Sequence, residues 1–89
     1  MIKIEFDPVK SRKNIEDRGL TFELATEFEL ETAVIRIDSR KQYGELRFNA
    51  LGYIGKRLYS ITYTLRVDTL RVISLRKANK REIRYYAET

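Results

Sequence analysis

The chain contains neither histidine nor cysteine, so two residue types on which many protein sites depend are missing. Without imidazole and thiolate it lacks the ligands of the usual zinc sites, and it can form no disulfide. The side chain that most readily exchanges a proton near neutral pH is absent too. Any proton transfer therefore falls to Asp, Glu, Lys or Tyr, and we expect neither a cofactor nor a bound metal.

Residues that break up a fold are also scarce, with one proline and four glycines among 89 residues, of which 43% are apolar. This composition is typical of a compact globular chain, and its length predicts one domain over residues 1–89. No apolar run is long enough to span a membrane, and the N-terminus does not resemble a signal peptide. We therefore expect a cytoplasmic protein without a membrane partner.

Charge is divided unevenly along the chain, although the net charge is only +5. Residues 1–35 carry five Lys/Arg and eight Asp/Glu, whereas residues 36–89 carry thirteen and five, which gives −3 and +8. A basic half of this kind attracts a polyanion. The arginines that follow the apolar pattern of residues 70–76 suit bidentate contact with phosphate oxygens.

The N-terminal third predicts a short strand and two helices. Alternation in residues 2–6 indicates a half-buried strand, and Asp7-Pro8 is a helix start whose helix, with a thin apolar stripe of Val9 and Ile15, ends at Gly19. Thr21 can cap a second helix that buries Phe22, Ala25 and Phe28. Its outward glutamates form either a solvated face, which we favour, or a docking surface: Glu23, Glu27, Glu29 and Glu31.

From residue 33 onward, apolar and polar residues alternate in four segments, 33–38, 46–54, 58–66 and 70–76, and a final helix follows over 78–87. Short turns imply antiparallel neighbours. We expect one face to be apolar, with Arg71, Ile73 and Leu75 on it, and the other to carry Arg47, Arg66 and Arg76. The predicted fold is α+β: a curved antiparallel sheet of about four strands, two N-terminal helices and one C-terminal helix.

A series of motifs in the same order resembles the BrnT family of toxins over nearly the whole chain. Two blocks are the most specific, Tyr43-Gly44-Glu45-x-Arg47 and Ile73-Ser74-x-Arg76-Lys77-Ala78. The other matching pieces are Phe6-Asp7-Pro8 with Lys10 and Asn14, Gly19-Leu20-Thr21-Phe22, Asp38-Ser39-Arg40, Gly52, Tyr63-Thr64-Leu65-Arg66 and Glu82.

The resemblance implies a RelE-like ribonuclease of a type II toxin–antitoxin system, which blocks translation by cutting RNA. It further implies a BrnA-like antitoxin with a ribbon-helix-helix DNA-binding part, so that operator DNA is reached only through the antitoxin. Homodimerisation within the complex stays open. Where the family usually has Lys-His before the glycine that ends the first helix, this chain has Asp17-Arg18. Either a proton-transfer group is lost, or Arg18 keeps a positive charge that the histidine supplies.

Cleavage of RNA without a metal requires that the 2′-hydroxyl be deprotonated, the phosphorane charge stabilised and the 5′-oxygen protonated. We predict Arg66 and Arg76 for charge stabilisation, Lys77 beside them for proton exchange, and Glu45 as general base. The alternative for Arg66, Arg76 and Lys77 is ordinary surface charge or ion pairs with Glu45 and Glu82. The alternative for Glu45 is an ion pair with Arg47 or with a residue of a neighbouring strand.

Other basic and aromatic side chains are candidates for holding RNA, because unpaired bases stack on aromatic rings. They are Arg40, Tyr43, Arg47, Arg81 and Tyr85. For Arg40 a solvated loop position is equally compatible, and for Tyr63 a core position is favoured. Two other functions compete with the ribonuclease: a catalytically weak module that binds RNA or the antitoxin, and a purely structural subunit.

Overall fold

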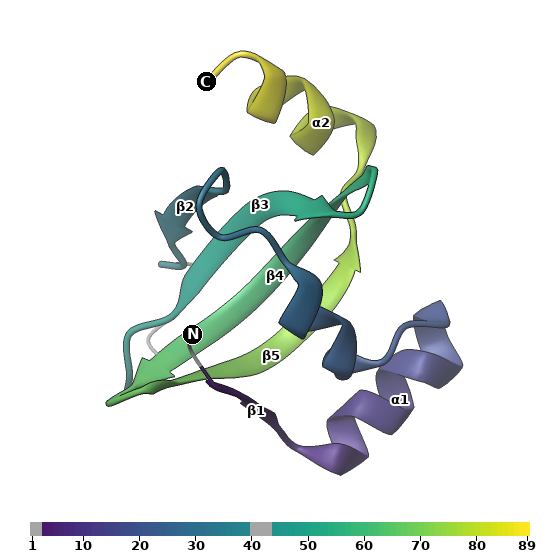
Figure 1. Cartoon of the computed structure of the whole chain (residues 1–89), viewed down its shortest axis with the longest axis vertical. Helices are drawn as coiled ribbons and strands as arrows, with labels where there is room; N and C mark the ends of the chain where they lie inside the picture. The colour runs from purple at the N-terminus through teal and green to yellow at the C-terminus, as the bar shows by residue number, and fades with distance from the viewer. Residues whose placement is uncertain (1–2, 40–43) are drawn as a thin grey trace.

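A computed structural model describes residues 3–39 and 44–89 (Figure 1), which form a five-stranded sheet and three helical segments. The sheet order is β1-β5-β4-β3-β2. In chain order the elements are β1 (Lys3–Phe6), α1 (Pro8–Arg18), η1 (Phe22–Glu27), β2 (Val34–Ile37), β3 (Phe48–Ile54), β4 (Arg57–Arg66), β5 (Thr69–Lys77) and α2 (Lys80–Ala87). The predicted α+β class is confirmed.

The sheet has one strand more than the roughly four predicted, and it is not wholly antiparallel. Strands β2 to β5 form an antiparallel meander, in which the two-residue turn Gly55-Lys56 joins β3 to β4. Gly55 has a φ of 61°, a conformation that favours glycine in such turns. Strand β1 pairs in parallel with β5, Lys3 opposite Thr69. Alternation reveals that a strand is present but does not reveal its partner.

Helix α1 begins and ends where the sequence predicts. The Asp7 carboxylate accepts a hydrogen bond from the Val9 N–H at 2.9 Å, and Gly19 ends the helix with a φ of 71°. Its buried face differs from the prediction, because Val9 and Ile15 are exposed while the polar Ser11 and Asn14 are buried. The helix is therefore held by hydrogen bonds of its inner face more than by an apolar stripe.

The second predicted helix is the 3₁₀-helix η1. The Thr21 hydroxyl accepts from the Glu23 N–H, and Phe28 ends the segment in an extended conformation. Phe22, Ala25 and Phe28 are buried, as predicted. The four glutamates of this region are exposed, which confirms their outward orientation: Glu23, Glu27, Glu29 and Glu31.

The main core lies between η1 and one face of the sheet, which we call the core face. Buried residues of η1 and its flanks meet the inward side chains of β3, β4 and β5: Leu20, Phe22, Ala25, Phe28, Ala50, Tyr59, Ile61, Tyr63, Leu70, Val72 and Leu75. Figure 1 shows η1 in front of the sheet and α1 beside β1 and β5. Tyr63 is only 3% exposed, which confirms its core position.

A β-bulge in β5 decides which side chains reach the opposite face. The register with β4 shifts between Thr62 and Tyr63, so that Val72 opposes Tyr63, Ser74 opposes Thr62 and Ile73 is the extra residue. The prediction that Arg71, Ile73 and Leu75 share the apolar face is therefore wrong for Arg71. The bulge turns Arg71, Ser74 and Arg76 to one side, which we call the polar face; it also carries Asn49, Ser60, Thr62 and Thr64.

Helix α2 packs against one end of the polar face. Leu51, Leu58 and Ala78 form a second small core there, on which Tyr53 and Tyr86 pack. The rings of Tyr53 and Tyr86 meet edge to face at 5.6 Å, and the Tyr86 hydroxyl donates to the Thr32 carbonyl oxygen at 2.9 Å. This confirms that the C-terminal helix packs against the sheet, and it makes α2 a wall beside the polar face (Figure 1).

Candidate active site

A pocket of about 320 Å³ opens between α2 and the polar face of the sheet. It draws residues from three strands, from the segment after β2 and from α2: Arg36, Ile37, Asp38, Ser39, Asn49, Arg76 and Glu82. The strand register places these side chains together. Arg36 of β2 pairs with Asn49 of β3, and Arg76 of β5 pairs with Ser60 of β4. The pocket is lined mostly by polar and charged groups.

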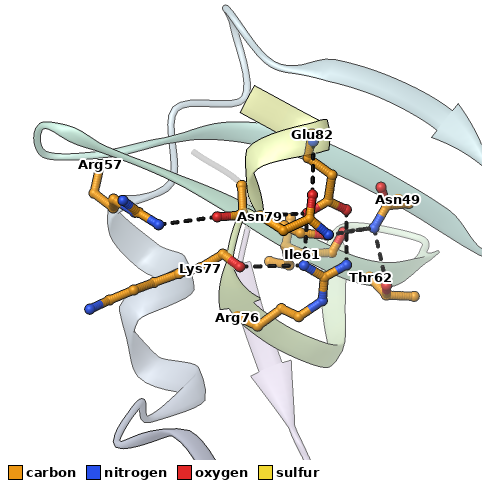
Figure 2. Close-up of polar contacts among 10 residues, drawn as sticks. Asn49, Arg57, Ile61, Thr62, Arg76, Lys77, Asn79 and Glu82 are labelled. Carbon is orange, nitrogen blue, oxygen red and sulfur yellow. Dashed lines mark hydrogen bonds and ion pairs between the residues drawn. The ribbon is translucent and has the colours of Figure 1, made fainter. Parts of the chain in front are cut away.

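The strongest contact in the pocket is the ion pair of Arg76 and Glu82 (Figure 2). The two terminal nitrogens of the Arg76 guanidinium donate to the two Glu82 carboxylate oxygens at 2.8 and 2.9 Å. Arg76 Nη1 also donates to the Lys77 carbonyl oxygen at 3.3 Å. Such a two-point contact fixes the plane of the guanidinium as well as its position.

Glu82 is itself held by the start of α2. Its Oε1 accepts from the Asn79 N–H at 3.0 Å, and the Asn79 side chain accepts from the Glu82 N–H at 2.8 Å. This capping box places the carboxylate at the first turn of the helix. The hydrogen bond from Arg76 lowers the pKa of Glu82 below its ordinary value of 4.5, so the carboxylate is ionised at neutral pH.

Hydroxyl and amide groups lie beside this ion pair on the sheet. Asn49 Nδ2 donates to Ser60 Oγ at 2.9 Å, with longer contacts of 3.4 Å to the Ile61 carbonyl oxygen and Thr62 Oγ1 (Figure 2). Ser60 and Thr62 are buried. Their hydrogen bonds with the Asn49 amide hold it in the pocket wall.

Arg36 enters the pocket from the edge strand β2 and contacts α2. Its guanidinium carbon lies 4.8 Å from the centre of the Tyr85 ring, a cation–π contact. The positive charge of Arg36 also contributes to lowering the pKa of Glu82. Two arginines thus share one small pocket with the carboxylates of Glu82, from α2, and Asp38, from the segment after β2.

Of the four residues predicted for catalysis, Arg76 alone lines this pocket. Lys77 pairs with Tyr59 and so points to the opposite side of the sheet, and Figure 2 shows its side chain extending away from the ion pair. Arg66 pairs with Thr69, six residues further along β4 than Ser60, which is roughly 20 Å away. Glu45 is exposed and contacts Arg47 Nε at 3.3 Å, the ion pair given as its alternative role.

Arg66 belongs to a second cluster at the other end of the polar face. Glu5 of β1 lies 3.4 Å from Arg71 Nη1 and 3.9 Å from Arg66 Nε. All three side chains are substantially exposed, so these contacts stabilise the fold only slightly. The polar face therefore carries arginines at both ends, where Glu82 contacts Arg76 at one end and Glu5 contacts Arg66 and Arg71 at the other.

The residues predicted to hold RNA are spread over the molecule. Tyr85 stacks on Arg36 at the pocket, Arg47 lies on the polar face beside Asp38, and Arg81 is exposed in the first turn of α2. Arg40 and Tyr43 lie outside the residues that the structure describes.

Arg36, Asp38, Asn49 and Glu82 were not predicted as site residues. A signal for Arg36 was present, because the apolar Ile35 and Ile37 on either side turn it to the opposite face of the strand. The ion pair of Arg76 with Glu82 is the alternative role given for Arg76, whereas the place of Glu82 in the lining of the pocket was not predicted.

Arg18, which stands where the resemblance implies a histidine, lines a different hollow. That space of about 220 Å³ is bounded by α1 and by Phe22 and Ile73, and it shares no lining residue with the Arg76 pocket. Across residues 3–39 and 44–89, no three Asp or Glu side chains are grouped so that they could hold a metal ion. Within the same residues, no helix is long and apolar enough to cross a membrane.

A family model described as the ribonuclease toxin BrnT of type II toxin-antitoxin systems matches residues 6–82. The chain belongs to the BrnT family. The matched region runs from β1 into α2 and contains every residue that lines the pocket, including the Arg76–Glu82 pair. None of the curated proteins matches the chain. Membership of the BrnT family makes this a toxin of the ribonuclease class, with an antitoxin as its partner.

Proposed function

We propose that the chain, as one domain, is a metal-independent endoribonuclease that inhibits translation by cutting single-stranded RNA at the Arg76 pocket. It works without a cofactor in the cytoplasm, and a BrnA-like antitoxin with a ribbon-helix-helix part neutralises it and carries it to operator DNA. The observation that carries the proposal is the two-point contact of Arg76 with Glu82, which holds a guanidinium in a polar pocket of the matched region.

The chemistry of the pocket suits attack by the RNA's own 2′-hydroxyl. The 2′-oxygen bonds to phosphorus as its proton leaves, and the bond from phosphorus to the 5′-oxygen breaks as that oxygen takes up a proton. The products are a 2′,3′-cyclic phosphate and a 5′-hydroxyl. Negative charge builds on the phosphoryl oxygens between these steps, and a guanidinium already fixed in place stabilises it without reorganising.

Proton transfer requires a group within reach of the reacting oxygens. Two carboxylates line the pocket, Asp38 and Glu82, and Glu82 is bound to Arg76 through both oxygens. We assign the proton transfer to Asp38 in the first place. Glu45 stays the second candidate, since its partner Arg47 accepts through its carbonyl oxygen from the Asp38 N–H at 2.8 Å.

The rest of the polar face extends the substrate site. Arg66 and Arg71 stand at the far end of the same face, where they can bind phosphates that flank the cleaved one. Arg47 precedes Phe48, which pairs with Tyr63, so it lies toward the Arg71 end of this face. Contacts with phosphates position the RNA and do not read its base sequence. Because they are electrostatic, we expect the affinity for RNA to fall steeply as the salt concentration rises.

The test is cleavage of a labelled single-stranded RNA by the purified protein in EDTA. Parent protein should cut, Arg76→Ala should lose about two to three orders of magnitude in rate, and Arg76→Lys should stay well below the parent because it keeps charge but no fork. Arg12→Ala removes an exposed charge from α1, away from the polar face, and should cut like the parent.

Each failure has a distinct meaning in this experiment. Cleavage that needs a divalent ion, or products with a 5′-phosphate, would contradict attack by the 2′-hydroxyl without a metal. RNA binding by the parent without any cleavage would favour the binding module, and equal activity of Arg76→Ala and the parent would move the active site elsewhere.

A further inference from the structure

The two arginines of the pocket are each held by one residue of α2. The two carboxylate oxygens of Glu82 accept hydrogen bonds from the two terminal nitrogens of Arg76, and the centre of the Tyr85 ring lies 4.8 Å from the guanidinium carbon of Arg36. Glu82 and Tyr85 are three residues apart in α2, and residues at this spacing lie side by side on a helix. One face of α2 therefore presents a carboxylate to one arginine and an aromatic ring to the other.

Helix α2 itself is fixed by contacts at both ends, although none of its residues is fully buried. At its start, Asn79 caps the helix and Arg57 Nη2 donates to the Ala78 carbonyl oxygen at 3.1 Å (Figure 2). Near its end, Tyr86 packs on Tyr53 and donates to Thr32. The helix is thus a rigid support and not a loose tail.

Arg36 and Arg76 would lie far apart if they were free to follow their strands alone. They come from β2 and β5, which are separated by β3 and β4 in the sheet. Long arginine side chains lose much rotamer freedom when they converge on one anion, and this loss weakens binding unless it has occurred during folding. Contacts with α2 impose that order in advance.

We propose that Arg36 is a second phosphate-binding residue of the site, and that Glu82 and Tyr85 of α2 are positioning residues that hold Arg76 and Arg36 around one RNA phosphodiester. The inference rests on the proposed function for the identity of the ligand. It adds a second guanidinium from the edge strand to the reacting phosphate and gives α2 a defined task.

Tyr85 acts here through the face of its ring, and its hydroxyl has no part in the role. Tyr85→Phe keeps the ring against Arg36 and should stay within twofold of the parent in kcat/KM. Tyr85→Leu removes the ring and should lower kcat/KM about two- to fivefold, the size of an exposed cation–π contact. Phenylalanine at position 85 could equally stack on an RNA base, so Tyr85→Phe does not separate the two roles. The decisive comparison adds Tyr85→Leu to Arg36→Ala. If Tyr85 acts through Arg36, Tyr85→Leu should cause no further loss of kcat/KM in that background.

Glu82→Gln removes the charge and keeps the capping box, since glutamine serves the same position. Positioning predicts a fall in kcat of about tenfold with little change in KM, because the Arg76 fork is no longer fixed in the transition state. A rise in RNA affinity instead would show that Glu82 competes with phosphate for Arg76, and it would overturn the positioning role.

Binding and cleavage are measured separately so that the two proposals can fail separately. The binding probe is a 2′-O-methyl RNA oligonucleotide, which lacks the attacking hydroxyl, titrated at several salt concentrations against parent, Arg36→Ala and the control Arg12→Ala. Arg36→Ala should lower kcat/KM at least tenfold and reduce the slope of log K against log salt by about 0.7, the value for one phosphate contact on a single strand.

If the parent cuts RNA while Arg36→Ala keeps both rate and salt slope, the Arg36 site is wrong and the ribonuclease stands. If instead the parent binds the probe without cutting any RNA, and Arg36→Ala lowers the salt slope, then Arg36 binds phosphate and the ribonuclease proposal is wrong. If the parent neither binds the probe nor cuts RNA, both proposals are refuted.

Discussion

Asn14 makes two hydrogen bonds, one that joins α1 to the sheet and one that joins it to the segment before η1, and its replacement should be among the most damaging changes outside the apolar core. Its side-chain nitrogen donates to the carbonyl oxygens of Leu20 at 2.9 Å and Leu75 at 3.0 Å. The residue is 9% exposed. Asn14→Ala removes both donors and leaves two buried acceptors without them, which costs about 3 kcal/mol.

That cost is large for a chain of this size. A domain of 89 residues has a free energy of unfolding of roughly 4 to 13 kcal/mol. Urea unfolding, followed by far-ultraviolet circular dichroism, should show the midpoint of Asn14→Ala about 3 M lower if the slope m is about 1 kcal/mol/M. The slope itself should not change, because the fold is the same.

Asn14→Asp tests the direction of these bonds at nearly constant size. At neutral pH it places a carboxylate against two carbonyl oxygens, so it should cost more than Asn14→Ala. The folded state raises the pKa of this new carboxyl above its unfolded value, hence the variant should gain stability as pH falls toward 4, where the protonated form can donate one bond. Arg12→Ala on the same helix should change stability by less than about 0.5 kcal/mol.

A cost of less than about 1 kcal/mol for Asn14→Ala, or equal stability of the aspartate and alanine variants at every pH, would refute this role of the Asn14 hydrogen bonds. Either result would mean that water replaces the amide at both carbonyls.

Two further changes test the core and the pocket. A Cβ on Gly52 would lie 2.6 Å from Phe28 Cζ and 3.1 Å from Ala33 Cβ, so Gly52→Ala should lower the free energy of unfolding by about 2 kcal/mol, measured in urea. In the double variant with Phe28→Leu the ring that causes the clash is gone, so Gly52→Ala should cost less there than in the parent. If the costs of the two single changes simply add, the clash is contradicted. Because Arg76 lowers the pKa of Glu82, the pair stabilises the fold fully above pH 4.5 and the contribution is lost as pH falls through the lowered pKa. Glu82→Gln should therefore be about 1 kcal/mol less stable at pH 7 and equal to the parent near pH 2, whereas a constant difference across this range would show that the charge is not the cause.

Local patterns were sufficient for most elements of this fold. Alternation located the strands, and Asp7-Pro8 with Gly19 gave both ends of α1, because caps and turns depend on residues close in the chain. The 3₁₀ geometry of η1 was missed because helical spacing over six residues fits both helix types.

The site was harder to predict, for a reason visible in β5. Strict alternation separates Arg71 from Arg76, and the bulge at Ile73, which brings them to one face, leaves no mark in the hydrophobic pattern. Arg76 was found because it ends a strand on the polar face. Arg66 was grouped with Arg76 because it also ends a strand on the polar face. Alternation predicts the face on which a side chain lies but not its place along the strand, and Arg66 and Arg76 lie at opposite ends of the β4–β5 pair.

The parallel pair of β1 and β5 has a consequence for the order in which the protein folds. The meander β2 to β5 closes through short turns, so it can form as the chain is made, whereas β1 must wait for residues 69–72, more than sixty positions later. Until then Ile4 and Phe6 have no strand beside them, and the hydrogen bond from Asn14 to Leu75 is absent. Both walls of the pocket also depend on late residues, since Arg76 and α2 belong to the last fifteen positions. A growing chain that lacks residues 69–87 therefore holds neither a complete sheet nor both walls of the pocket.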